Sequence, residues 1–168
     1  TELSIWIDYI QNDVSGGSGY EEPNNWVNVL KTGNLLFEMI FVGDTCDTPR
    51  FVAARNYIEE HWYDPGNGWF DIGWGYDTVP SHYQAMFTVM KGLEYSGLDL
   101  IDLDGDTVLD ENWFNQDPPL TPAEDFASVL VAQQAADGSW HNPNGWDDTA
   151  DGSLSTLWAL LTIEKIAP

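Results

Sequence analysis

A short segment recurs three times along this chain of 168 residues, and the repetition is the strongest constraint on its fold. DYIQND at 8–13 resembles NYIEEH at 56–61, and LVAQQAADG at 130–138 takes the same place later. When Gln11 is aligned with Glu59 and Gln133, the interval between the second and third repeats is longer than the interval between the first and second. The segment 98–122 accounts for the difference, and we interpret it as an insertion.

The pattern of each repeat predicts two helices separated by a long loop rich in Gly and Trp. The three loops span residues 15–26, 64–80 and 137–153. An amphipathic helix precedes each loop and a more apolar helix follows it. We therefore expect an all-α fold of three antiparallel helical hairpins in one domain, 1–168. The expected units are 1–47, 48–97 and 123–168.

Start and stop signals place several helix ends. Thr-Pro pairs and small polar residues favour the first turn of a helix, whereas Gly favours the position just past its end. We expect the third, fourth and fifth helices to begin at Thr48-Pro49, at Pro80 or Ser81, and at Thr121-Pro122, and the second and fourth to end at Gly43 and Gly97. We expect little strand, and the segment GWFDIGWGY at 68–76 is one place where short strands could pair locally.

The third unit contains a Gln-x-x-Asp-Gly-Ser-Trp run formed by Gln134, Asp137, Gly138, Ser139 and Trp140. This run resembles the repeat shared by squalene and terpenoid cyclases and by protein prenyltransferase β-subunits. The resemblance is best over 126–166, fair over 48–97 and weak before that. It implies an α/α toroid, in which each hairpin places one helix in an inner ring and one in an outer ring. Three hairpins would form an arc of such a ring.

The tryptophans of the loops have two interpretations. As structural residues, Trp69, Trp74, Trp140 and Trp146 would pack between successive hairpins and donate their indole N–H groups to backbone carbonyls. The alternative is an aromatic platform for sugars or prenyl chains.

The charge of the chain excludes several partners. Lys and Arg number 5 against 28 Asp and Glu, which gives a net charge of −23. Nucleic acids and anionic membrane surfaces would be repelled. The chain is also 43% hydrophobic, which excludes a disordered acidic tail, and no apolar run approaches the roughly 18 residues of a membrane span. The acidity fits a protein of high-salt surroundings, a secreted or cell-surface protein in a calcium-containing medium, or an ordinary acidic protein.

The segment DLDGDTVLDENW at 102–113 predicts a calcium loop. Alternating carboxylates let a short loop direct several oxygens at one hard cation. The segment resembles dockerin and EF-hand loops, although Thr107 replaces the usual Gly and Trp113 replaces the usual acidic residue. The expected ligands of Ca2+ are Asp102, Asp104, Asp106, the Val108 carbonyl, Asp110 and Glu111. Asp99 or Asp117 is an alternative to Glu111, and a solvated acidic turn is the alternative to a metal site.

Two other patterns suggest catalysis. Asp147-Asp148-Thr149-Ala150 is similar to the acidic motif of class II terpene cyclases, which would make Asp147 the acid and Asp148 its neighbour. Gly145 replaces the first Asp of that motif, so a role in helix capping is the favoured interpretation. A prenyltransferase-like zinc site would need the single cysteine, Cys46, with one of His61, His82 and His141, which are scattered in sequence.

The favoured function is a non-catalytic calcium-binding α/α-toroid module of a secreted or cell-surface protein, serving in binding or self-assembly. An enzyme of the terpenoid-cyclase-like or carbohydrate-active toroid type is the alternative. The chain begins with Thr1, so we expect a mature form or an excised fragment. The first and last helices carry apolar residues that we expect to contact adjoining domains or other copies: Leu3, Ile5, Trp6, Tyr9, Ile10, Leu157, Leu160, Leu161 and Ile163.

Overall fold

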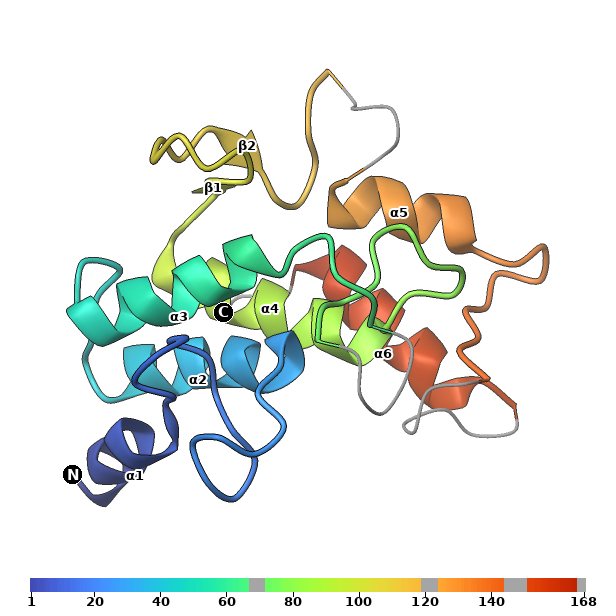
Figure 1. Cartoon of the computed structure of the whole chain (residues 1–168). Coiled ribbons are helices and arrows are strands. Elements are labelled where there is room, and N and C mark those ends of the chain that lie inside the picture. The colour runs from blue at the N-terminus through green and yellow to red at the C-terminus, as the bar shows by residue number, and fades with distance from the viewer. Residues whose placement is uncertain (67–71, 119–123, 144–150, 166–168) are drawn as a thin grey trace.

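The computed structural model describes residues 1–66, 72–118, 124–143 and 151–165, and these ranges are mostly helical (Figure 1). They contain six helices: α1 (Glu2–Ile10), α2 (Val29–Phe41), α3 (Pro49–Glu60), α4 (Tyr83–Ser96), α5 (Phe126–Gln133) and α6 (Ser153–Glu164). A small antiparallel sheet pairs β1 (Leu100–Ile101) with β2 (Glu111–Asn112). The prediction of a largely helical fold with little strand is confirmed. None of the described helices is both long and apolar enough to cross a bilayer.

Helix α4 lies at the centre of the described chain. It packs most extensively against α2 and next against α6, while α1 and α3 contact α2 and α5 contacts α6. Each expected unit therefore contributes one helix to the row formed by α2, α4 and α6 and one helix outside that row. Two glycines, Gly33 of α2 and Gly92 of α4, bring the backbones of the two helices into direct contact.

Three of the predicted helix ends are confirmed. Thr48 precedes Pro49 at the start of α3. Gly43 and Gly97 follow α2 and α4 with φ angles of 99° and 74°, and the residue after each donates its N–H back into the last turn. These hydrogen bonds satisfy carbonyl groups that the helix end leaves without partners. They require the left-handed conformation, which Gly adopts without steric cost, and this explains why Gly marks both positions.

The fourth helix begins later than predicted. Helix α4 begins at Tyr83, because the His82 ring accepts the hydrogen bond from the Ala85 N–H. The helix start expected at Thr121-Pro122 lies outside the described residues. Helix α5 begins at Phe126, where the Asp125 carboxylate accepts from the Ser128 N–H at 2.8 Å. A carboxylate suits the positive end of a helix better than a hydroxyl does.

The local pairing considered for 68–76 is not seen in residues 72–76, the described part of that segment. The strands form instead in the insertion, at β1 and β2.

An aromatic cluster joins the second and third units. The ring of Phe126 stacks on Trp62 with a centroid distance of 5.0 Å, and Trp74 meets it edge-on at 4.8 Å. Trp113 completes the cluster from the insertion at 5.9 Å. All four side chains are buried, and the indole N–H groups of Trp62 and Trp113 donate to backbone carbonyls.

Two of the four tryptophans expected between hairpins, Trp74 and Trp140, are buried as predicted. Trp140 donates its indole N–H to the Leu130 carbonyl at 2.9 Å. The buried indole N–H of Trp74 has no acceptor among the described residues. Trp69 and Trp146 lie outside the described residues.

Helices α1 and α5 end in the same way. Gln11 and Gln134 follow them in extended conformations, with φ and ψ of −70° and 130° and of −65° and 127°. Each side-chain amide donates to a glycine carbonyl in the loop that follows, Gly16 at 2.7 Å and Gly138 at 3.1 Å. The structural equivalent of Gln11 is thus Gln134, one position beyond the Gln133 of the sequence alignment.

Candidate metal centre

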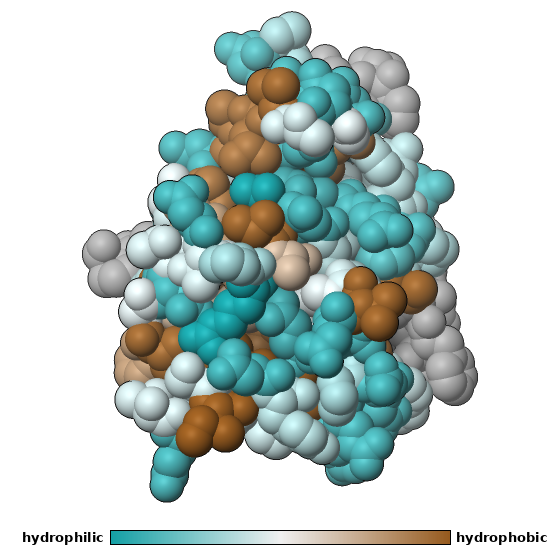
Figure 2. All heavy atoms as spheres, turned by 60° about the vertical axis from the view of Figure 1, so that its left-hand side comes forward, coloured by the Kyte–Doolittle hydropathy of each residue, from teal (hydrophilic) through white to brown (hydrophobic). Residues whose placement is uncertain are grey.

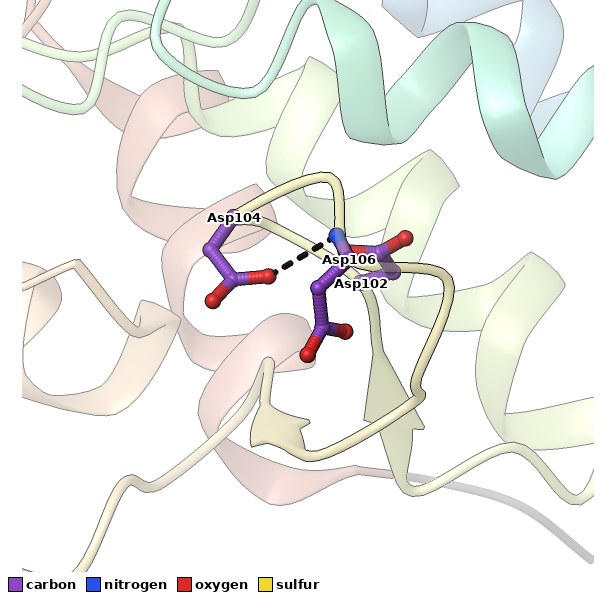
Figure 3. Close-up of side chains that lie close together, drawn as sticks. All are labelled: Asp102, Asp104 and Asp106. Carbon is purple, nitrogen blue, oxygen red and sulfur yellow. Dashed lines mark hydrogen bonds between the residues drawn. The ribbon is translucent and has the colours of Figure 1, made fainter.

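The acidic loop lies between the two short strands, at one edge of the molecule (Figures 1 and 3). Ile101 pairs with Glu111, and the Asp110 N–H donates to the Ile101 carbonyl. Ile101 and Trp113 are buried. The ends of the loop are therefore fixed to the core, while residues 104–107 are exposed.

The carboxylates are oriented by the backbone of their own loop. Asp102 accepts hydrogen bonds from the N–H groups of Gly105 at 2.7 Å and Thr107 at 2.8 Å. Asp104 accepts from the Asp106 N–H at 3.0 Å, the bond drawn in Figure 3, and Asp106 accepts from the Val108 N–H at 2.8 Å. Asp102 uses two of its acceptor positions on the loop, Asp104 and Asp106 use one each, and every one of the three carboxylates keeps others free.

One ligand oxygen from each of Asp102, Asp104 and Asp106 lies within 4.8 Å of the other two. Two like charges separated by 4 Å repel by about 1 kcal/mol even in bulk water, and by more near a protein surface. The arrangement therefore costs free energy unless a cation neutralises it. Carboxylate oxygens are ligands that hard divalent cations such as Ca2+ and Mg2+ take, so this group could hold such an ion.

Thr107 stands where the usual calcium-loop pattern has Gly, the residue that most readily adopts a positive φ. Thr107 adopts a left-handed conformation with φ of 72°, and Gly105 does so with φ of 80°. A β-branched residue is strained there. Two bonds to the Asp102 carboxylate, from Gly105 and Thr107, hold the strained backbone in place.

Two of the other predicted ligands lie outside this group. Neither Asp110 nor Glu111 belongs to the group of three carboxylates. Glu111 accepts from the Leu103 N–H at 3.1 Å, and burial raises its pKa, with the adjacent Asp110 adding to the effect. The alternative ligand Asp99 lies 3.9 Å from the ammonium group of Lys165.

Glu59 of α3 connects the loop to the helical body. Its carboxylate accepts the Asp102 N–H at 3.1 Å and lies 3.2 Å from Arg55 Nε, although that N–H has no hydrogen-bond geometry to any described acceptor. Burial raises the pKa of Glu59. An open groove of about 550 Å³ lies between this part of α3 and the loop. One feature of the sequence points to this role, because Glu59 aligns with Gln11 and Gln133 of the other repeats.

The remaining candidates do not form a second centre within the described ranges. Cys46 lies between α2 and α3, His61 contacts Asp64 at 2.6 Å, and His82 caps α4. Neither they nor His141 joins a metal-binding group of the described part of the chain. Asp147 and Asp148 lie outside the described residues.

Comparison with known proteins identifies no relative: no family model, no curated protein and no solved structure matches the chain. The resemblance to cyclase repeats and to calcium loops is therefore carried by the residues of this chain alone.

Proposed function

We propose that this chain is a non-catalytic calcium-binding α/α-toroid module of a secreted or cell-surface protein, which serves in binding or self-assembly. The observation that carries the proposal is the group of carboxylates formed by Asp102, Asp104 and Asp106 within a turn ordered by its own backbone. Calcium takes six to eight oxygen ligands with flexible geometry. Backbone carbonyls and water supply the rest at an exposed loop.

The toroid part of the proposal is supported by the packing of the helices. Helices α2, α4 and α6 form a continuous row, and α1, α3 and α5 lie outside it. In an α/α toroid the row would be the inner ring and the other helices the outer ring. Two antiparallel helices joined by a loop in each unit would produce this alternation.

Calcium would act on the fold through Glu59 and the loop. Neutralising the three aspartates removes their mutual repulsion, and the Asp102 N–H already bonds to α3. Binding to the folded chain alone stabilises it by mass action, by about 2.7 kcal/mol when free calcium exceeds Kd a hundredfold. For a chain of this length, that free energy raises the melting temperature by roughly 5–10 °C.

Calorimetric titration of the chelator-treated protein with calcium, with melting curves, tests the proposal. We expect one binding event and the rise in melting temperature given above. The double variant Asp104→Asn with Asp106→Asn should lose both, because two exposed carboxylates of the group become neutral. The double variant Glu21→Gln with Glu22→Gln, an exposed pair away from the loop, is the charge-matched control. Absence of heat and of any melting shift at millimolar calcium would show that the loop is a solvated acidic turn.

Self-assembly is predicted from the two ends of the helical row. Ile5 and Tyr9 of α1 and Leu157 and Leu160 of α6 are exposed, as expected from the sequence. We expect further copies of the chain to cover these faces, which would extend the arc. The net charge of −23 opposes association at low salt, so assembly should strengthen as salt or calcium rises. Sedimentation across both series measures it, and a compact monomer throughout would remove self-assembly while leaving calcium binding intact.

A further inference from the structure

A second groove, with a volume of about 180 Å³, lies among α1, the loop after it and α2. All of its lining residues come from the first 38 residues of the chain, so it is separate from the acidic loop. Its lining combines two aromatic rings, Trp6 and Tyr20, with three polar side chains of α2, Lys31, Asn34 and Glu38. Figure 2, which turns the α1 and α2 side forward, shows a largely hydrophilic surface with separate hydrophobic patches on the described part of that face.

The two aromatic rings are presented to solvent. Trp6 is 44% exposed and Tyr20 is 57% exposed, whereas Trp62, Trp74, Trp113 and Trp140 are fully buried in the core. The ring of Tyr20 is flanked by Trp26, with a centroid distance of 6.1 Å. Trp26 has a left-handed φ of 51°, a conformation that is strained for a residue with a large side chain. Such strain concentrates at ligand sites, and here it places an aromatic pair beside the groove.

The three polar side chains share one face of α2, at the spacing of successive turns. None of them makes a hydrogen bond or ion pair with the described residues through its side chain. Burial lowers the pKa of Lys31 to about 8. Burial also raises the pKa of Glu38, and the positive charge of Lys91 opposes that rise. The groove therefore holds the ammonium donor of Lys31, the carboxylate acceptor of Glu38 and the amide of Asn34. These groups make no side-chain hydrogen bond to the described residues, and burial shifts the pKa values of the two charged ones.

Lys31 differs from the other basic residues of the chain. Arg50 binds Asp8 and Asp44, and Arg55 pairs with Glu59. Lys165 pairs with Glu94, and Lys91 lies over the ring of Phe37 at 3.7 Å. The chain has 28 acidic residues, yet the half-buried Lys31 contacts none of the described carboxylates. Burying an unpaired charge in this way costs free energy. A ligand that accepts its hydrogen bonds would offset that cost.

We infer that this groove binds a neutral saccharide, with one sugar ring against Trp6 and Tyr20 and its hydroxyls bonded to Lys31, Asn34 and Glu38. The C–H face of a pyranose fits an aromatic face, and its hydroxyls both donate and accept, which matches the three polar groups. The lining carries one group of each charge, Lys31 and Glu38, and the net charge of −23 of the chain disfavours anionic ligands. The site does not depend on calcium or on the acidic loop.

Titration with cellotriose and with N,N′,N″-triacetylchitotriose, followed by calorimetry, tests this inference. At least one of the two should bind saturably in the micromolar to millimolar range, and trigalacturonate, an anionic trisaccharide, should not. Trp6→Ala should weaken binding roughly tenfold, the equivalent of one lost ring contact. Phe41→Ala, an exposed ring outside the groove, is the control and should bind normally. Absence of binding by both neutral probes, or equal binding by Trp6→Ala, would overturn the inference.

Lys31→Met separates the ligand role from a structural one. The pKa of Lys31 is lower in the folded chain than the ordinary value of 10.5, so its ammonium group destabilises the fold near neutral pH. The variant should therefore melt at a higher temperature than the wild type at pH 7, and the difference should fade as pH rises from about 8 towards 10.5. Saccharide binding should nevertheless fall roughly tenfold, as for the loss of a hydrogen bond from a charged donor. A stabilised variant that binds saccharide as tightly as the wild type would overturn the inference.

Discussion

Replacing Trp62 by Ala is expected to lower the free energy of unfolding by about 3–5 kcal/mol. Trp62 is fully buried directly after α3, and its ring stacks on Phe126 with an interplanar angle of 6°. It also meets Trp74 edge-on at 5.3 Å. The substitution would leave a cavity at the centre of the cluster, and aromatic pairs contribute beyond the area that they bury.

The hydrogen bond of Trp62 adds to this effect. Its indole N–H donates to the Glu124 carbonyl at 3.0 Å, immediately before Asp125, which caps α5. The substitution would therefore loosen α5 as well as the core, because α5 begins with Phe126. Trp62→Phe retains a ring and loses the hydrogen bond, so its loss should be intermediate.

Chemical denaturation followed by circular dichroism measures the change. Trp6→Ala is the matched control, because it removes the same side chain from a half-exposed position on α1. It should cost clearly less than Trp62→Ala, since part of its surface is already in water. Equal losses for the two variants would mean that the aromatic cluster does not dominate the stability of this chain.

Replacing Gly33 by Ala is expected to destabilise the chain by about 1–3 kcal/mol, although Ala is the better helix former. A Cβ at Gly33 would lie 2.6 Å from the backbone carbon of Thr88 and the backbone nitrogen of Val89 on α4. Backbone atoms in the middle of a helix cannot move aside as the end of a side chain does. A Cβ at Gly92 would meet the Gly33 carbonyl oxygen at 2.7 Å, so the contact is close from both sides.

Gly43→Ala distinguishes this clash from the general cost of losing a glycine. Gly43 has a positive φ, and nothing lies within 4 Å of the position its Cβ would take. Its substitution should cost only the strain of the left-handed conformation, of the order of 1 kcal/mol. Denaturation midpoints of the two variants give the comparison. If Gly33→Ala were as stable as the wild type, α2 and α4 would be able to separate without cost.

Features that depend on a few consecutive residues are predictable from the sequence. Gly43, Gly97 and Thr48 mark helix ends because the hydrogen bonds of a helix terminus involve residues only a few positions away. The same holds for the acidic loop. Asp102, Asp104 and Asp106 converge because alternate residues of one short turn hydrogen-bond to its own N–H groups.

Features that join distant segments depend on the tertiary structure. Glu59 bonds to the acidic loop only because α3 packs beside it, and Asp125 caps the helix whose first residue, Phe126, stacks on the distant Trp62. The groove assembles side chains from α1, a loop and α2. Lys31 looks like any surface lysine in sequence, since its burial and its lack of a partner among the described residues depend on its surroundings rather than on its neighbours along the chain. Local backbone bonding is encoded within a turn or two, whereas desolvation and pairing of side chains are determined by which segments the folded chain brings together.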